Sequence, residues 1–162
     1  GRSVGVTAAA TGLSFAVPAQ VETRASRAPA NAPATVAADR IAVIGGGDLL
    51  VSVDVYRNPD GVDVERWLTH DMAFLLDRDT RRAKTVAGSE RRPAIRLIAA
   101  ATPQRPAREI VLVALGRVLV AVTCEQASDR RANAAMTRIV ATLRAAQSPA
   151  ARRRPRPRGR TR

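Results

Sequence analysis

Hydrophobic and polar residues alternate over several short stretches of the chain, which is the pattern of β-strands that bury one face. The clearest stretch is LLVSVDVY at residues 49–56, and RIAVI at residues 40–44 precedes it. The glycines at residues 45–47 lie between these two β-rich segments, and such a break predicts a hairpin. A shorter alternating stretch, residues 13–17, predicts a strand that ends at Pro18.

The second half of the chain predicts further strands, at residues 83–87, 94–101, 109–115 and 118–125. The last two strands are separated only by Gly116-Arg117, so they predict a second hairpin. Both are apolar at almost every position, and we expect them to be central strands covered by helices on both faces. Residues 20–39, in contrast, are rich in Ala, Pro and polar residues and predict a long loop.

Two segments carry apolar residues at helical spacing. The first helix is predicted to begin with Asp60 or Asp63 as its N-cap and to run to about Arg78. Its apolar positions are Val64, Trp67, Leu68, Met72, Leu75 and Leu76. The second helix is predicted to start near Ser128-Asp129 and to end before Ser148. Its apolar positions are Ala132, Ala135, Met136, Ile139, Val140 and Leu143.

The length of 162 residues and the 46% hydrophobic content fit one globular domain. We expect a flexible segment over residues 1–12, one domain over residues 13–147, and a disordered Arg/Pro-rich tail over residues 148–162. One Cys and one His exclude a disulfide framework and a Cys/His zinc site. No apolar run approaches the length of about 20 residues that spans a bilayer, so no membrane span is predicted.

The formal net charge of +13 is unevenly distributed. The segment RRRPRPRGRTR at residues 152–162 carries more than half of it and contains no acidic residue. Its arginines are candidates for sequence-independent contact with a polyanion such as DNA, RNA or an anionic lipid surface. These candidates are Arg152, Arg153, Arg154, Arg156, Arg158, Arg160 and Arg162. The alternative, a solvated tail shaped by genome composition, stays open at this point.

The opening GLSFAVP, the hairpin that ends in LLVSVDVYRN, the helix around VERWLTHDMAFL and the closing helix MTRIVATL together resemble the PsbP-like superfamily, including its bacterial DcrB-like branch. Gly12, Phe15 and Pro18 match the family's opening strand, whereas Leu13 stands where an aromatic residue is more usual. The resemblance implies an α+β fold, an α/β/α sandwich around a central antiparallel sheet flanked by two main helices. It also implies a non-enzymatic accessory or binding protein, and it supplies no catalytic residue.

Four patterns invite a catalytic or cofactor-binding interpretation. The glycines after RIAVI suggest a dinucleotide site, but the following β-branched alternation predicts a strand instead of the helix that such a site needs. His70 with Asp71 suggests an acid/base pair, but neighbours on a helix point about 100° apart, and an exposed helical histidine is favoured. Cys124 lies in an apolar run and is interpreted as a buried hydrophobic residue. Asp54 and Glu125 are a pair of carboxylates whose convergence the sequence leaves open.

We therefore expect a non-enzymatic accessory or protein-binding module with an unidentified protein partner and no cofactor or metal. The alternative is a nucleic-acid-associated protein that binds through the Arg-rich tail. The chain shows no signal peptide, and because it begins with Gly, a native start upstream is kept open. Its compartment and its oligomeric state are not predicted.

Overall fold

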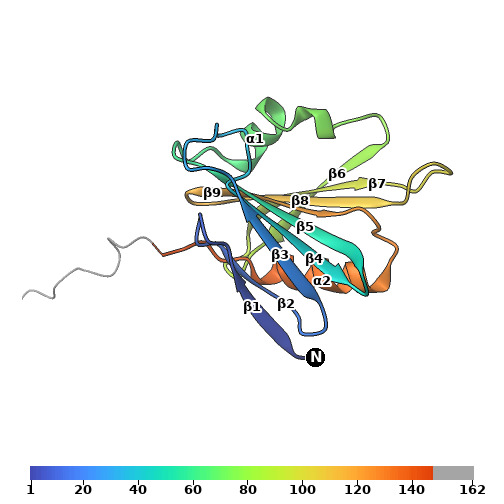
Figure 1. Cartoon of the computed structure of the whole chain (residues 1–162). Helices are drawn as coiled ribbons and strands as arrows, with labels where there is room; N and C mark the ends of the chain where they lie inside the picture. The colour runs from blue at the N-terminus through green and yellow to red at the C-terminus, as the bar shows by residue number, and fades with distance from the viewer. Residues whose placement is uncertain (148–162) are drawn as a thin grey trace, which may run out of the picture.

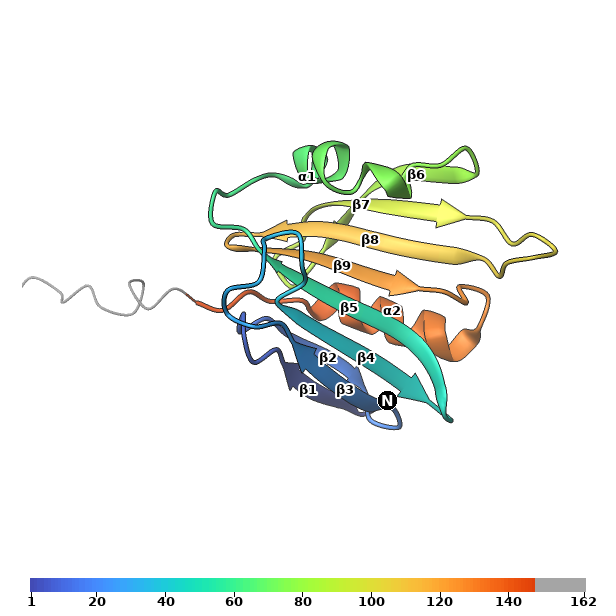
Figure 2. The ribbon, with the colours of Figure 1, turned by 45° about the horizontal axis from the view of Figure 1, so that its top comes forward.

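The computed structural model describes residues 1–147 as an α+β fold built on a seven-stranded antiparallel sheet. The strand order in this sheet is β3-β4-β5-β9-β8-β7-β6, and β1 and β2 form a separate two-stranded ribbon (Figures 1 and 2). The strands are β1 (Ser3–Thr7), β2 (Ser14–Pro18), β3 (Glu22–Arg27), β4 (Asp39–Gly45), β5 (Asp48–Arg57), β6 (Thr80–Ala87), β7 (Arg92–Ala99), β8 (Arg108–Leu115) and β9 (Val118–Cys124). The helical elements are α1 (Val64–His70), the 3₁₀ turn η1 (Ala73–Leu75) and α2 (Arg130–Thr142).

Both predicted hairpins are confirmed. Strands β4 and β5 pair from Asp39↔Val55 to Gly45↔Asp48, and the two residues between them, Gly46 and Gly47, have φ values of 61° and 89°. Positive φ at both central positions is what a tight hairpin turn requires and what glycine allows without steric cost. Strands β8 and β9 are likewise joined through Gly116, at φ 63°.

Two strands of the structure were not predicted from the sequence. The N-terminal segment expected to be flexible contains β1, which pairs with β2 from Ser3↔Pro18 to Thr7↔Ser14. The predicted long loop contains β3, the edge strand that pairs with β4 from Glu22↔Ile44 to Arg27↔Asp39. Both strands are exposed along almost their whole length. Strand β3 shows no apolar alternation, and β1 alternates only at Val4 and Val6, of which only Val6 is partly buried, so the pattern did not reveal either strand.

The first helix is shorter than predicted. It begins after Asp63, whose carboxylate accepts a hydrogen bond from the backbone N–H of Arg66 at 2.8 Å, and it ends at His70. The chain then forms η1 over three of the residues that were expected to extend the helix to about Arg78. Apolar residues continue at helical spacing beyond His70 because Leu75 packs in the same buried cluster as Trp67. This spacing led to the prediction of a longer helix.

Helix α2 begins where it was predicted. Its N-cap Asp129 accepts hydrogen bonds from the backbone N–H groups of Ala132 and Arg131, at 3.1 and 2.8 Å. These bonds, chiefly the one from Ala132, lower the pKa of the Asp129 carboxyl. The carboxylate at the start of the helix thereby fixes where α2 begins.

The core consists of two clusters on opposite faces of the sheet. Val111 and Val113 of β8 belong to the cluster that contains Met136 and Ile139 of α2, together with Phe15 of β2. Alternate residues of the same strand, including Ile110 and Leu112, belong to the cluster that contains Trp67 and Leu68 of α1. Strands β8 and β9 are buried on both faces, as their continuous apolar sequences predict.

Candidate binding groove

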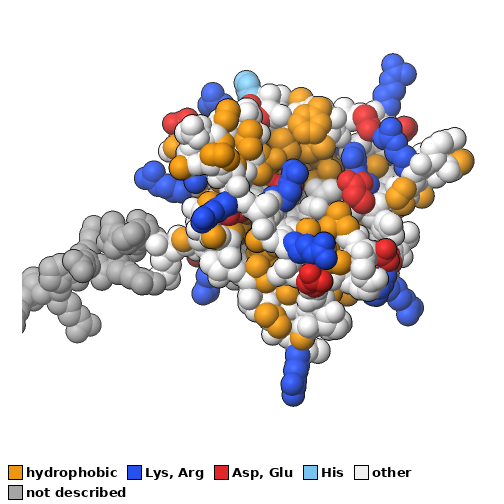
Figure 3. All heavy atoms as spheres, in the orientation of Figure 1, with side chains coloured by type: hydrophobic (Ala, Val, Ile, Leu, Met, Phe, Trp, Pro, Cys, Tyr) orange, Lys and Arg blue, Asp and Glu red, His pale blue; other side chains and the backbone are white. Residues whose placement is uncertain are grey.

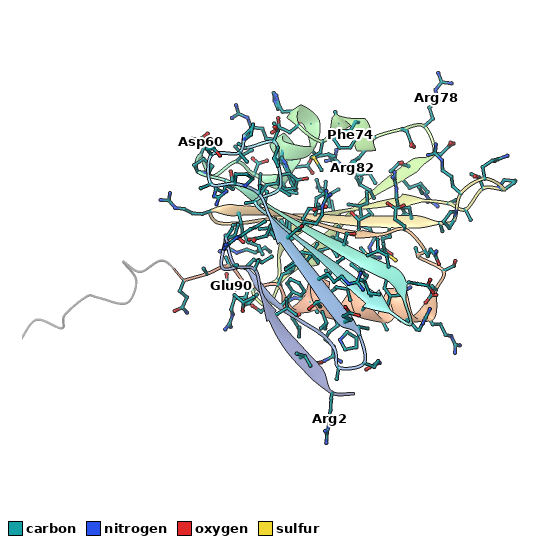
Figure 4. The ribbon with its side chains drawn as sticks, in the orientation of Figure 1. Arg2, Asp60, Phe74, Arg78, Arg82 and Glu90 are labelled. Atoms are coloured by element: carbon teal, nitrogen blue, oxygen red, sulfur yellow. The ribbon has the colours of Figure 1, made fainter. Side chains whose placement is uncertain are left out.

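Several turns and the segment that follows α2 enclose a groove of about 620 Å³ at one end of the molecule. Its walls are the β6–β7 turn, the β8–β9 turn and residues 143–147, with Thr11 of the β1–β2 turn added on one side. Glu90, which marks the β6–β7 turn, lies near the point where the described chain ends (Figure 4). We call this feature the end groove and define it by these segments.

The segment after α2 is held on two sides. Its residue Arg144 forms an isolated antiparallel bridge with Ser14 of β2, through backbone hydrogen bonds of 2.9 and 2.8 Å. On the other side, the backbone N–H of Gly88 donates to the carbonyl of Val140 at 2.7 Å, and that of Ser89 donates to the carbonyl of Leu143 at 3.0 Å. The β6–β7 turn therefore satisfies carbonyls that the end of α2 would otherwise leave free.

The β1–β2 turn is anchored to the sheet by Asp39 of β4, which is 3% exposed. Its carboxylate accepts hydrogen bonds from the backbone N–H of Ala10 at 3.0 Å and from the backbone N–H and the hydroxyl of Thr11 at 2.9 and 2.6 Å. A buried carboxylate is tolerated when several donors satisfy it. Asp39 thus places Thr11 at the wall of the end groove.

The β8–β9 turn is clamped by Asn58, which is also 3% exposed. The side-chain amide of Asn58 donates to the carbonyls of Val62 and Gly116, at 2.9 and 3.3 Å. Its backbone N–H donates to the carbonyl of Arg117 at 2.8 Å. The backbone that carries Arg117 is consequently fixed from a neighbouring loop.

The end groove combines an apolar floor with a basic rim. Leu115, Val118 and Leu143 form the buried part of its lining. The exposed side chains of the rim are Arg92, Arg117, Arg144 and Glu90. Glu90 pairs with Arg92 at 3.2 Å, whereas Arg117 and Arg144 have no ion-pair partner within residues 1–147. Two guanidinium groups are therefore available to an anionic ligand beside an apolar surface.

The structure separates the other candidate residues. His70 is exposed on the last turn of α1, and residues 1–147 contain no cluster of three His, Cys, Asp or Glu side chains able to hold a metal ion. Asp54 pairs with Arg40 at 2.7 Å and lies opposite Ala121 of β9. Glu125 is four residues further along the chain, about 13 Å at strand spacing, so Asp54 and Glu125 do not converge.

Cys124 is completely buried at the end of β9, as its apolar surroundings predict. Burial raises the pKa of its thiol, and nearby acidic residues including Glu109 raise it further. We expect the native protein to react with iodoacetamide at neutral pH far more slowly than the unfolded protein does. Mass spectrometry of timed samples, with and without urea, measures both rates. Equal rates in the two samples would show that the thiol is accessible in the native fold.

The seven arginines predicted to bind a polyanion, Arg152 to Arg162, lie outside the described residues. The described chain ends at Gln147, which itself lines the end groove. The end groove was not predicted from the sequence, because its residues come from turns scattered between Thr11 and Gln147. The only sequence signal is the recurrence of a glycine turn close to an arginine, at Gly88 with Arg92 and at Gly116 with Arg117.

Two further surface features are present, and the second shares the β6–β7 turn residue Ser89 with the end groove. Hydrophobic side chains gather over α1 and η1, where Phe74 is 75% exposed and Leu76 is 40% exposed (Figures 3 and 4). A second hollow, of about 510 Å³, lies between α2 and strands β6 to β8. Its polar residues include Arg96 and Glu109, which form an ion pair at 2.8 Å.

The sequence matches no protein-family model and no curated protein. The structure is similar to the solution structure of cyanobacterial PsbP (CyanoP) from Synechocystis sp. PCC 6803, with a TM-score of 0.50 and 9% sequence identity. The match covers 89% of this chain and 92% of that chain. At this identity the similarity establishes the fold alone. Within residues 1–147, no helix is long and apolar enough to cross a membrane.

Proposed function

Because the chain has a PsbP-like fold, we propose that it is a non-enzymatic accessory module that binds another protein, and that the end groove is its binding site. The two helices and the sheet then act as a rigid α/β/α sandwich that presents the turns of the groove. Binding sites on such folds are commonly formed by loops that a rigid scaffold holds in place.

The observation that carries this proposal is the combination of an apolar floor with arginines that lack an acidic partner in the described part of the chain. Arginine is enriched where proteins bind one another, and apolar surface bordered by polar groups is typical of binding sites. The hydrogen bonds of Asp39, Asn58 and Ser89 hold the walls of the groove before a partner arrives. A site that is already ordered loses less entropy on binding.

Site-specific photo-crosslinking tests the proposal. A photoreactive amino acid replaces Arg117 at the end groove or, as the control, Arg78, which points away from the body at the other end of the molecule (Figure 4). Both chains are irradiated in extract of the source cells. We expect a discrete protein adduct from position 117 that is absent from position 78. The same adducts at both positions, or none at position 117, would contradict binding through the groove.

A second candidate function is binding to a polyanion through the tail arginines. It is favoured by the charge of residues 152–162, seven arginines and no acidic residue, and by their place in the sequence shortly after Gln147, the last described residue, which lines the end groove. Duplex DNA is titrated at several salt concentrations with the intact chain and with a chain that ends at Ala151. We expect only the intact chain to bind, with a log-log salt slope of up to about −0.9 per phosphate neutralised. Equal affinity of the two chains would contradict a role of the tail.

A further inference from the structure

We propose that the end groove accepts an acidic, amphipathic segment of a partner polypeptide, whose carboxylates contact Arg117 and Arg144 while its apolar side chains cover Leu115, Val118, Ala145 and Ala146. This inference rests on the proposed function and goes beyond it by assigning the chemistry of the partner. It follows from the charge, the floor and the fixed geometry of the groove.

The charge of the rim selects an anion. Glu90 neutralises Arg92, at 3.2 Å, and leaves two rim arginines without an acidic partner among the described residues. A planar guanidinium pairs with a carboxylate through two parallel hydrogen bonds, which makes arginine well suited to Asp or Glu side chains. An occupant with two suitably spaced carboxylates therefore matches this rim.

The floor selects an occupant that also carries apolar groups. Leu115 and Val118 retain 6% and 7% exposure, and the small residues Ala145 and Ala146 extend the lining beside them. A phosphate backbone would leave this surface uncovered, and single-stranded nucleic acid usually stacks its bases on aromatic rings. None of the described residues that line the groove is aromatic. The lining thus favours a peptide over a nucleic acid.

The chain's own C-terminal segment is a poor occupant. Residues 152–162 carry seven arginines and no acidic residue, so like charges would face the basic rim. A stretch of sequence this basic also attracts acidic partners and raises their rate of encounter with the chain. The basic rim of the groove and the basic C-terminal sequence therefore both favour a negatively charged partner.

The two rim arginines that have no acidic partner within residues 1–147 also stand on fixed backbone. The carbonyl of Arg117 accepts the hydrogen bond from Asn58 at 2.8 Å, and both backbone groups of Arg144 bond to Ser14. Their separation is consequently set by the fold. The entropy lost on binding then comes mainly from ordering the partner segment, which favours recognition of a short linear segment.

The test uses a short dye-labelled peptide of glutamate, leucine and alanine and the intact chain. Two double variants lose the same charge: Arg117→Gln with Arg144→Gln in the groove, and Arg78→Gln with Arg81→Gln, both exposed and outside the groove. Fluorescence anisotropy measures the affinity. We expect the groove variant to bind about tenfold more weakly than wild type, and the control variant to bind almost as wild type does.

Three further probes decide what the groove recognises. A peptide with glutamine in place of glutamate and a glutamate-only peptide are each expected to bind more weakly than the amphipathic peptide, and the groove variant is expected to bind a short duplex DNA as wild type does. Equal binding of the glutamate-only peptide would overturn the proposal, and so would DNA binding that the groove variant loses as strongly as it loses the peptide, because the groove would then respond to charge alone. Equal loss in the two double variants would overturn it as well.

The outcomes separate this inference from the proposed function. A protein adduct at position 117 without peptide binding would leave the function standing and reject the acidic segment as occupant. Peptide binding that the groove variant abolishes, without any adduct at position 117, would support the ligand chemistry and reject a protein partner in the extract. Folding of every variant is checked by its circular dichroism and its unfolding midpoint.

Discussion

Replacement of Asp39 by alanine is expected to lower the free energy of unfolding by about 3 kcal/mol. The substitution leaves the backbone N–H groups of Ala10 and Thr11 without their acceptor in a site where the carboxylate is 3% exposed. An unsatisfied buried polar group costs about 1–3 kcal/mol. Urea unfolding followed by circular dichroism measures the change. The β1–β2 turn should loosen as well, because Asp39 is its link to the sheet.

Asp54→Ala is the matched control on the neighbouring strand. Asp54 forms one ion pair, with Arg40, whose side chain is 65% exposed. Exposed ion pairs contribute about 0–1 kcal/mol, so the control should lose less than about 1 kcal/mol. Equal losses in the two variants would show that the three hydrogen bonds to Asp39 do not stabilise the turn.

Gly88→Ala is expected to lower the free energy of unfolding by a similar amount, about 3 kcal/mol. Gly88 has a φ of 83°, a conformation that L side chains rarely adopt. A Cβ atom there would also lie 2.9 Å from the backbone oxygen of Leu143. That oxygen must shift, although it accepts the hydrogen bond from Ser89 at 3.0 Å. The wall of the end groove would open along with the loss of stability.

Gly47→Ala separates the two causes. Gly47 has a φ of 89°, but a Cβ atom there would meet no atom within 4 Å. The control therefore reports conformational strain alone, about 1–2 kcal/mol. Denaturant unfolding of both variants gives the difference. If Gly47→Ala destabilised the protein as much as Gly88→Ala, the contact between the β6–β7 turn and the end of α2 would have no energetic role.

The parts of the fold that were predicted from sequence are those with a strong local signal. The hairpin at Gly46-Gly47 combines β-branched strands with glycines at positive φ, and α2 combines an N-cap at Asp129 with an apolar stripe. Strand β3 has neither signal, because its side chains face solvent at the edge of the sheet. Its pairing with β4 is decided by contacts distant in sequence, which a local pattern does not contain.

The end groove was even less predictable from local sequence patterns than strand β3. Arg117 and Arg144 are ordinary arginines in a sequence that contains many, and only the fold brings their turns together. Ser14 and Arg144 are 130 residues apart and yet bond through their backbones. The resemblance to the PsbP-like superfamily predicted an α+β fold around an antiparallel sheet, and the structure, which is similar to that of cyanobacterial PsbP, confirms this much. It contained no information about where this chain would present unpaired charge.

A partner protein is expected to bind at the end groove. The most direct test measures the affinity of the protein identified by crosslinking at position 117 for three intact chains: wild type, the Arg117→Gln and Arg144→Gln double variant, and the Arg78→Gln and Arg81→Gln control. We predict that the groove variant binds about tenfold more weakly, whereas the control binds as wild type does. Unchanged affinity of the groove variant would contradict binding at the end groove, since Arg117 and Arg144 would then take no part in recognition.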